Sequence, residues 1–244
     1  MSSLGLILCA AGSRAPAALA AIDALRQETA LAFPGIDVVI AFRSIEAVSH
    51  WRGQGREIPV VAEAVRRLAG AGRSRLLLVN LSFNGRLEFP GDAGGMEMRM
   101  TPPLLEKASL PWVSEWLSAR LQPQALNILV GHGVRDPGGN QLLVAVAEQL
   151  AIAGLRVVLT TLEGDPGTRH LGRVGASAVH LQPLFLFDGH HWRRDVLEVW
   201  PERFSLPPFT AGLPLCSEPS IRLRFLELAG HELAAAGWRS VDQA

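Results

Sequence analysis

The feature that most constrains the fold of this chain is its alternation of short apolar runs with segments of helical periodicity. The apolar runs are rich in Leu, Ile and Val, which is typical of parallel strands buried on both faces. The expected strands cover residues 4–10, 38–42, 75–81, 97–100, 126–130, 155–160 and 178–187. The expected helices cover residues 16–33, 59–71, 112–121, 141–153 and 222–236. Strands that alternate with helices in this way predict parallel sheets covered by helices on both faces.

The order of elements in the first half of the chain recurs in the second half. Ala10-Ala11-Gly12 holds the place at the end of the first strand that Gly131-His132-Gly133 holds at the end of the fifth. A recurrence of this kind indicates a divergent internal repeat. The sequence therefore predicts an α/β protein of two similar lobes, each a parallel sheet flanked by helices, with a cleft between them. We expect an N-terminal lobe at residues 1–122 and a C-terminal lobe, carrying a metal site, at residues 123–244.

Composition excludes several classes of protein. The 23 basic and 23 acidic residues balance, whereas nucleic-acid binders usually show a basic excess. Cys9 and Cys216 are the two cysteines and have no CxxC spacing, which argues against a zinc finger or an iron–sulfur cluster. No apolar run reaches transmembrane length and no signal peptide is evident, so we expect a cytoplasmic protein without a membrane partner. Walker A, GxGxxG and GxSxG sequences are absent, and we expect no organic cofactor.

Three chemically versatile residues stand at or just beyond the ends of expected strands in the second half. They are His132, Glu163 and His191. Ligands bind at the carboxyl ends of the strands in open α/β sheets. Two imidazoles and one carboxylate meeting there would bind a divalent transition metal and leave positions open for water or substrate.

Each of these residues also has a plainer interpretation. His132 would then be a loop histidine bonded to backbone, Glu163 a solvated turn carboxylate, and His191 part of a surface basic cluster. Asp165 is an alternative ligand to Glu163. Adjacent histidines usually point in different directions, so we assign His191 to the metal. The side chains that could orient its ring from a second shell are His190, Asp188 and Asp195.

Several arginines lie near strand ends or in the loops that follow them. They are Arg14, Arg43, Arg135, Arg193 and Arg194. Arginine holds carboxylates through paired hydrogen bonds, so this set suits a small polyanionic ligand. Ser13 and Asn84 hold places in the first half that match those of the metal ligands in the second. We therefore expect Ser13, Arg14, Arg43 and Asn84 to bind substrate.

Taken together, these motifs resemble a known family over nearly the whole chain. The motifs are Ala41-Phe42-Arg43-Ser44, Asn84-Gly85, Gly131-His132-Gly133, Glu163 with Pro166, His180-Leu181-Gln182-Pro183-Leu184, Gly189-His190-His191 and Glu218-Pro219-Ser220-Ile221-Arg222. In order and spacing they are similar to the anaerobic cobalt chelatases of the CbiK type, within the class II tetrapyrrole chelatases. One departure is His190, where that family often has aspartate.

The resemblance implies a two-lobed fold and the insertion of Co(II) into sirohydrochlorin on the way to cobalamin. The metal is then a substrate, the tetrapyrrole is the partner, and the family's His-Glu-His set falls on His132, Glu163 and His191. Alternatives remain open at this point. They are a chelatase for Fe(II) or Ni(II), a non-catalytic tetrapyrrole or metal carrier, and a metal-dependent hydrolase. The sequence leaves a homo-oligomer open.

Overall fold

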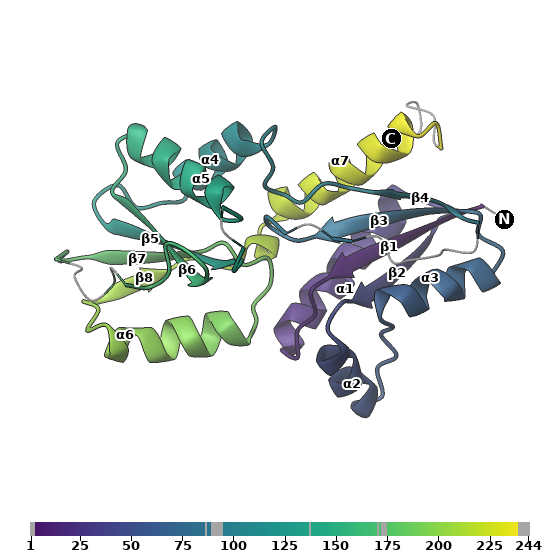
Figure 1. Ribbon diagram of the computed structural model, residues 1–244, viewed down its shortest axis with the longest axis horizontal. Coiled ribbons are helices and arrows are strands. Elements are labelled where there is room, and N and C mark those ends of the chain that lie inside the picture. The colour runs from purple at the N-terminus through teal and green to yellow at the C-terminus, as the bar shows by residue number, and fades with distance from the viewer. Residues whose placement is uncertain are drawn as a thin grey trace. The chain divides into compact units, whose positions relative to one another are not determined.

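The chain forms two compact α/β units, which Figure 1 shows as ribbons. The computed structural model describes residues 3–85, 87–88, 95–136, 138–169, 171 and 175–238. The first unit consists of Met1–Leu104 with Pro219–Ala244, and the second consists of Leu105–Glu218. Each unit contains one four-stranded parallel sheet. The α/β class expected from the sequence is therefore confirmed.

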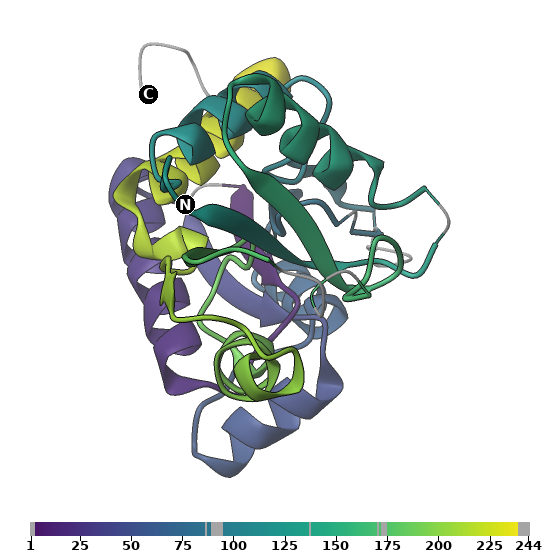
Figure 2. The same ribbon diagram turned by 90° about the vertical axis from the view of Figure 1, so that its left-hand side faces the viewer.

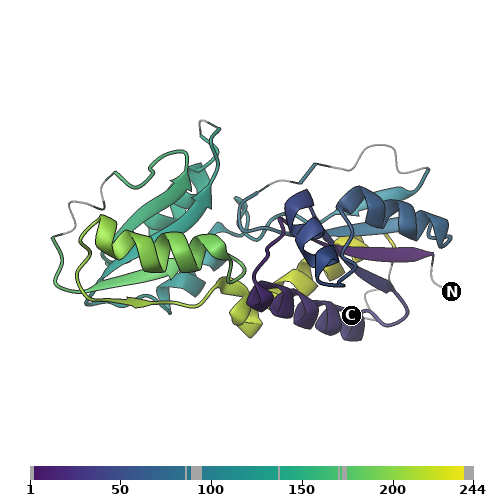
Figure 3. The same ribbon diagram turned by 90° about the horizontal axis from the view of Figure 1, so that it is seen from below.

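The sheet of the first unit has the strand order β2-β1-β3-β4. Its strands are β1 (Leu4–Ala10), β2 (Asp37–Phe42), β3 (Arg75–Leu81) and β4 (Glu97–Met100). Its helices are α1 (Pro16–Ala32), α2 (Ile45–Gly53), α3 (Val61–Gly70) and α7 (Pro219–Ala235). Val65 and Leu68 of α3 pack on one face of the sheet, against Ile7 and Leu78. Helices α1 and α7 cover the other face, as Figure 3 shows.

The sheet of the second unit repeats this topology with the order β6-β5-β7-β8. Its strands are β5 (Leu126–Gly133), β6 (Val157–Glu163), β7 (Val179–Pro183) and β8 (Phe209–Ala211). Its helical elements are α4 (Leu110–Ser118), α5 (Gln141–Ile152), the π-helical segment η2 (His191–Val199), α6 (Trp200–Arg203) and the 3₁₀ turn η3 (Leu215–Ser217). Helices α4 and α5 lie on one face of this sheet, and the continuous η2–α6 rod lies on the other (Figures 1 and 2).

The η2–α6 rod is held to the sheet by three aromatic and aliphatic side chains at four-residue spacing. Trp192, Val196 and Trp200 are buried and belong to one cluster with the β5 and β7 side chains of that face. Residues four apart share a face of a helix. This packing fixes the start of η2, where His191 lies, against the sheet.

The boundary between the units differs from the expected lobes, 1–122 and 123–244, in two places. The chain passes to the second unit at Leu105, because α4 packs on α5. It returns to the first unit at Pro219, because α7 packs on α1 and β3. An ion pair of 3.0 Å between Arg222 of α7 and Glu28 of α1 reinforces this return. Both packings join segments distant in sequence, which the repeat pattern did not reveal.

Strand β7 is also shorter than the expected strand at residues 178–187, because it ends at Pro183. Proline lacks the N–H that a following sheet partner would need. The helix α2, the η2–α6 rod and the short strand β8 were not expected from the sequence. Among the helices of the described residues, none has both the length and the apolar character needed to cross a bilayer.

Candidate metal centre

His132 and His191 come together although they lie 59 positions apart in the sequence. His132 is the penultimate residue of β5, and His191 is the first residue of η2. Their ring centroids lie 5.3 Å apart with the ring planes 78° apart. Both side chains belong to exposed residues. The structure therefore brings together the two histidines that the sequence had selected, within one unit.

Among the described residues, the hydrogen bonds of the two histidines leave the same ring nitrogen, Nε2, of each one unused. Nδ1 of His132 lies 3.1 Å from the carbonyl oxygen of Gly133, and Nδ1 of His191 lies 2.6 Å from Oδ2 of Asp195. A carbonyl or a carboxylate oxygen only accepts, so each Nδ1 carries the proton and donates it. Each Nε2 then keeps a lone pair when the ring is neutral. A lone pair of this kind is what a transition metal requires of an imidazole.

Asp195 is thus the side chain that orients His191, one turn further along η2. The other two expected orienters have different contacts. Asp188 accepts two hydrogen bonds from Arg193, at 2.8 and 2.6 Å. The ring of His190 stands edge-on to that of His191, with 6.1 Å between centroids. That Asp188 or His190 orients the ring of His191 stays a prediction.

Glu163 is held apart from the histidine pair. It is the last residue of β6 and pairs in register with Gly133 of β5. Side chains alternate between the faces of a sheet, so His132, one residue before Gly133, starts from the face opposite to that of Glu163. The carboxylate of Glu163 instead meets Arg135, with 3.0 Å between Oε1 and Nη2. Within the described ranges, no three His, Cys, Asp or Glu side chains stand at metal-binding distance.

A buried asparagine fastens the loop after β5 to the end of β6. The Oδ1 atom of Asn140 accepts from the backbone N–H of Val134 at 3.0 Å. Its Nδ2 atom donates to the carbonyl oxygens of Val134, Glu163 and Asp165. Asn140 is 5% exposed. Sequence reasoning missed this residue, since its partners are up to 25 positions away.

Two glycines allow the backbones of these loops to touch. Gly133 and Gly164 have φ angles of +73° and +69°. A Cβ atom on Gly133 would overlap the carbonyl oxygen of Glu163, and one on Gly164 would overlap that of Val134. Glycine is the residue that adopts a positive φ and tolerates such an approach without strain. The Gly-His-Gly sequence therefore has a backbone reason as well as a chemical one.

The four expected substrate-binding residues lie at the carboxyl edge of the first sheet. The Ser13 hydroxyl accepts from the backbone N–H of Ala15, the residue before α1, at 3.1 Å. Arg14 and Arg43 are exposed. Asn84 is half-buried, and its Nδ2 atom has no hydrogen-bond partner among the described residues. An unpartnered buried amide is unfavourable in the absence of a ligand, which is consistent with a binding role.

The two cysteines offer no soft-metal chemistry at these edges. Burial raises the pKa of the Cys9 thiol to about 12, although the Arg43 charge opposes the shift. A metal is bound by the thiolate, so Cys9 is a core residue near neutral pH. Cys216 is buried as well.

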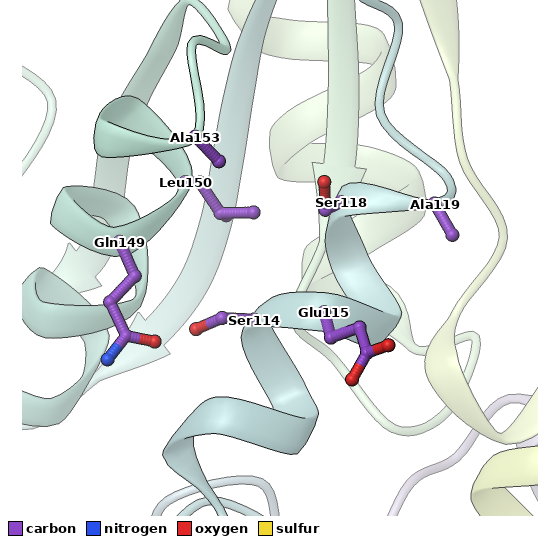
Figure 4. A pocket seen from close by; sticks show the side chains of 7 residues that line it. All are labelled: Ser114, Glu115, Ser118, Ala119, Gln149, Leu150 and Ala153. Carbon is purple, nitrogen blue, oxygen red and sulfur yellow. The ribbon is translucent and has the colours of Figure 1, made fainter.

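A separate hollow of about 420 Å³ lies between α4 and α5. Figure 4 shows its lining, which comprises Ser114, Glu115, Ser118, Ala119, Gln149, Leu150 and Ala153. Ser114 is 7% exposed, and its hydroxyl has no partner among the described residues. None of the expected ligand or substrate residues lines this hollow.

Comparisons with known proteins agree with this assignment of fold. The family model of CbiX matches residues 126–223, the segment that holds β5 to β8 and all three expected metal ligands. No curated protein matches the chain significantly. The matching family model is thus that of CbiX, and the CbiK type inferred from the motifs is not confirmed.

Solved structures share the fold over almost the entire chain. SirB from Bacillus subtilis with Fe³⁺ superposes with a TM-score of 0.69 at 14% identity, covering 98% of each chain. SirB from Bacillus subtilis subspecies spizizenii in complex with cobalt gives 0.68 at 14% identity, covering 97% of this chain and 98% of that one. CbiX, described as the terminal enzyme of siroheme biosynthesis in denitrifying bacteria, gives 0.65 at 18% identity, covering 93% and 98%. The chain therefore has the fold of the sirohydrochlorin chelatases, and its segment 126–223 is similar to the CbiX family.

Proposed function

We propose that this protein is a chelatase that inserts a divalent metal ion into sirohydrochlorin. Co(II) is the preferred metal of the proposal, and cobalamin biosynthesis is the pathway. The observation that carries it is the pair of histidine rings, His132 and His191, whose centroids lie 5.3 Å apart and whose Nε2 atoms have no partner in the part of the chain that the structure describes. The similarity of this segment to CbiX, and the cobalt and iron present in the similar SirB structures, support it.

In the proposed reaction, His132 and His191 bind the metal through Nε2, and Glu163 completes the site. Glu163 must first leave Arg135, to which it is bonded at 3.0 Å. Two histidines and a carboxylate leave positions for water, and waters can be exchanged for ring nitrogens one at a time. Ser13, Arg14, Arg43 and Asn84 bind the carboxylates of the macrocycle. Binding energy spent on bending the ring exposes the nitrogen lone pairs.

The protons released in the proposed reaction balance the charge of the metal ion that is inserted. Two pyrrole N–H protons must leave the macrocycle as one divalent cation enters it. The imidazoles and the carboxylate that release the cation become able to accept those protons. The exchange of one M²⁺ for two H⁺ leaves the charge of the protein site unchanged. His132, Glu163 and His191 are therefore the catalytic residues of the proposal.

An iron chelatase is the second candidate. It is favoured by the Fe³⁺ in one SirB structure and by the siroheme role stated for the similar CbiX structure. The donor set does not choose the metal, because affinity for a site of nitrogen and oxygen donors rises from Fe(II) through Co(II) to Ni(II) whatever the pathway. The proposal places the enzyme in the cytoplasm, where metal availability would decide between them.

An anaerobic absorbance assay tests the proposal. Sirohydrochlorin is mixed with Co(II), Fe(II) or Ni(II), alone, with the protein, and with its His132→Ala variant. We expect a metal-dependent spectral change that is faster with the protein than without it and is lost in the variant. If no metal is inserted faster than in the protein-free reaction, the chelatase proposal fails, and tight binding of the metallated product would then indicate a carrier.

A further inference from the structure

The ion pair between Arg135 and Glu163 is weak enough to be broken by a competing ligand. It is a single contact of 3.0 Å between Nη2 and Oε1. The side chain of Arg135 is 84% exposed and that of Glu163 is 35% exposed. Water and salt screen an ion pair of this exposure, and such pairs contribute little to stability. A divalent cation can therefore displace the guanidinium from the carboxylate easily.

The backbone beneath the pair is fixed, in contrast to the side chains. Asn140 bonds both the N–H and the carbonyl of Val134, the residue before Arg135, and it also bonds the carbonyl of Glu163. The glycines at positions 133 and 164 let the two loops touch. Arg135 and Glu163 are thus kept adjacent whatever the state of their side chains. Loss of the ion pair should therefore move the guanidinium group of Arg135 while the loop backbone stays in place.

We propose that Arg135 is a substrate-binding residue which the metal sets free. The inference rests on the proposed function. While the site is empty, Glu163 occupies Arg135. When the metal binds Glu163, the guanidinium is released beside the metal and can bind a carboxylate of the tetrapyrrole, which it fits through paired hydrogen bonds.

Because coupling between two ligands is reciprocal, metal and macrocycle then raise each other's affinity by the same factor. That factor is limited by the strength of the ion pair, about twofold to fivefold for an exposed pair. The coupling imposes no compulsory order, because whichever ligand binds first improves the binding of the other. A macrocycle that arrives first finds the arginine already engaged by Glu163.

Sirohydrochlorin binding without any metal tests this directly, in four proteins. They are the wild type, Arg135→Gln, Glu163→Gln and the double variant, each checked for folding by circular dichroism. Loss of the Glu163 charge should free Arg135, so Glu163→Gln should bind sirohydrochlorin about twofold to fivefold more tightly than the wild type. In the Arg135→Gln background the same change should have no effect.

The cycle separates this inference from simple repulsion between Glu163 and an anionic ligand. An equal gain in both backgrounds would mean repulsion alone, and no gain in either would mean that Arg135 does not touch the macrocycle; both results overturn the proposal. Arg156→Gln serves as the matched control, since Arg156 is exposed and lies just before the opposite end of β6. It should bind sirohydrochlorin as the wild type does.

A Co(II) titration of the same proteins distinguishes failure of this inference from failure of the proposed function. Arg135→Gln should bind Co(II) up to about fivefold more tightly than the wild type at low ionic strength, with a smaller gain at high salt. An unchanged affinity overturns the role of Arg135 alone. Co(II) binding that persists in His132→Ala would instead remove the metal site on which the proposed function depends.

Discussion

The central strands of the two sheets end in similar glycine turns, but the side chains around the two turns differ. In each, the central strand is followed or closed by a glycine of positive φ, Gly12 at +106° and Gly133 at +73°. The residue before that glycine is Ala11 in the first unit and His132 in the second. Ser44, the N-cap of α2, lies beside Gly12, and Glu163, the last residue of β6, lies beside Gly133. An arginine follows two residues after each glycine, at positions 14 and 135.

Both units share this glycine turn, which we call the platform, and the side chains around it determine what it binds. The first unit keeps the turn and the arginine but lacks nitrogen and carboxylate ligands at these places, which suits recognition of an anionic ligand. The second unit has the ligands as well. Metal binding should therefore respond only to variants in the second unit, whereas macrocycle binding should also respond to variants in the first.

The largest effect is expected where the two units differ most. His132→Ala gives the second unit the residue that the first unit carries at that place. Loss of one of two imidazole ligands should lower Co(II) affinity and insertion rate by more than about 100-fold, beyond the range seen for second-shell partners. Titration and the insertion assay measure both. His231→Ala, on the exposed face of α7, should behave as the wild type, and a similar loss there would break the comparison.

The two glycines of the platform should differ in their tolerance of a side chain. Gly133→Ala places a Cβ against the backbone of Glu163, whereas in Gly12→Ala the nearest atoms are side-chain carbons at 3.0 Å or more. We expect Gly133→Ala to destabilise the protein by about 3 kcal/mol. Gly12→Ala should destabilise it by roughly half as much, since its strain is mainly that of the positive φ. Urea unfolding followed by circular dichroism compares them, and equal losses would contradict the packing described here.

Asp195 sharpens the comparison because the orientation of His191, a proposed metal ligand, depends on it. Its carboxylate accepts from Nδ1 of His191 at 2.6 Å. Asp195→Ala should weaken Co(II) binding about 10- to 100-fold by releasing the ring and its tautomer. Asp188→Ala, which removes a partner of Arg193 instead, is the matched control. Equal effects of the two variants would show that the orienting bond is not what matters.

A variant in the first unit should weaken binding of the macrocycle without changing binding of the metal. Arg43→Gln removes an exposed guanidinium at the end of β2. We expect its KM for sirohydrochlorin to rise about threefold to tenfold, the value of a charge-assisted hydrogen bond partly screened by water. Its Co(II) affinity should be unchanged. A drop in Co(II) affinity would mean that the division of labour between the units is wrong.

The smallest effect concerns a buried histidine whose counterpart is apolar. His180 of β7 pairs with Asn127 of β5, as Leu77 of β3 pairs with Leu6 of β1. Burial lowers the pKa of His180 from 6.5, and the nearby Gln182 side chain opposes the shift. Below pH 6.5 the unfolded chain therefore takes up this proton before the folded protein does.

Stability from this source is present above pH 6.5 and is lost as the pH falls through and below that value. His180→Gln should flatten this part of the profile of unfolding free energy against pH, measured in urea. Leu77→Val in the first unit should lower stability at every pH without changing the slope. An unchanged slope in His180→Gln would contradict the assignment of the acid sensitivity to His180.

Local sequence patterns predicted most of the fold. They also predicted that two of the three proposed metal ligands, His132 and His191, lie close together. Apolar runs predicted seven of the eight strands that the structure describes, because buried parallel strands have a distinct composition. Signals for the missed helices were present. Ser44 caps α2 by accepting from Ala47 N–H, and Trp192, Val196 and Trp200 repeat every fourth residue.

Non-local contacts account for what the sequence did not reveal. The Asn140 bonds, the pairing of Arg135 with Glu163 and the return of α7 to the first unit join residues 6 to 194 positions apart. The sequence placed Glu163 with the histidines because the ends of parallel strands meet at one edge. The strand register, which puts Glu163 beside Gly133, was not readable from one chain.

The measurement that tests the central claim most directly is anomalous scattering at the cobalt edge from crystals of the protein grown with Co(II). The account predicts one cobalt ion within bonding distance of Nε2 of both His132 and His191, with Glu163 turned from Arg135 to the metal. A cobalt ion bound elsewhere, or one held without His132 and His191, would contradict it.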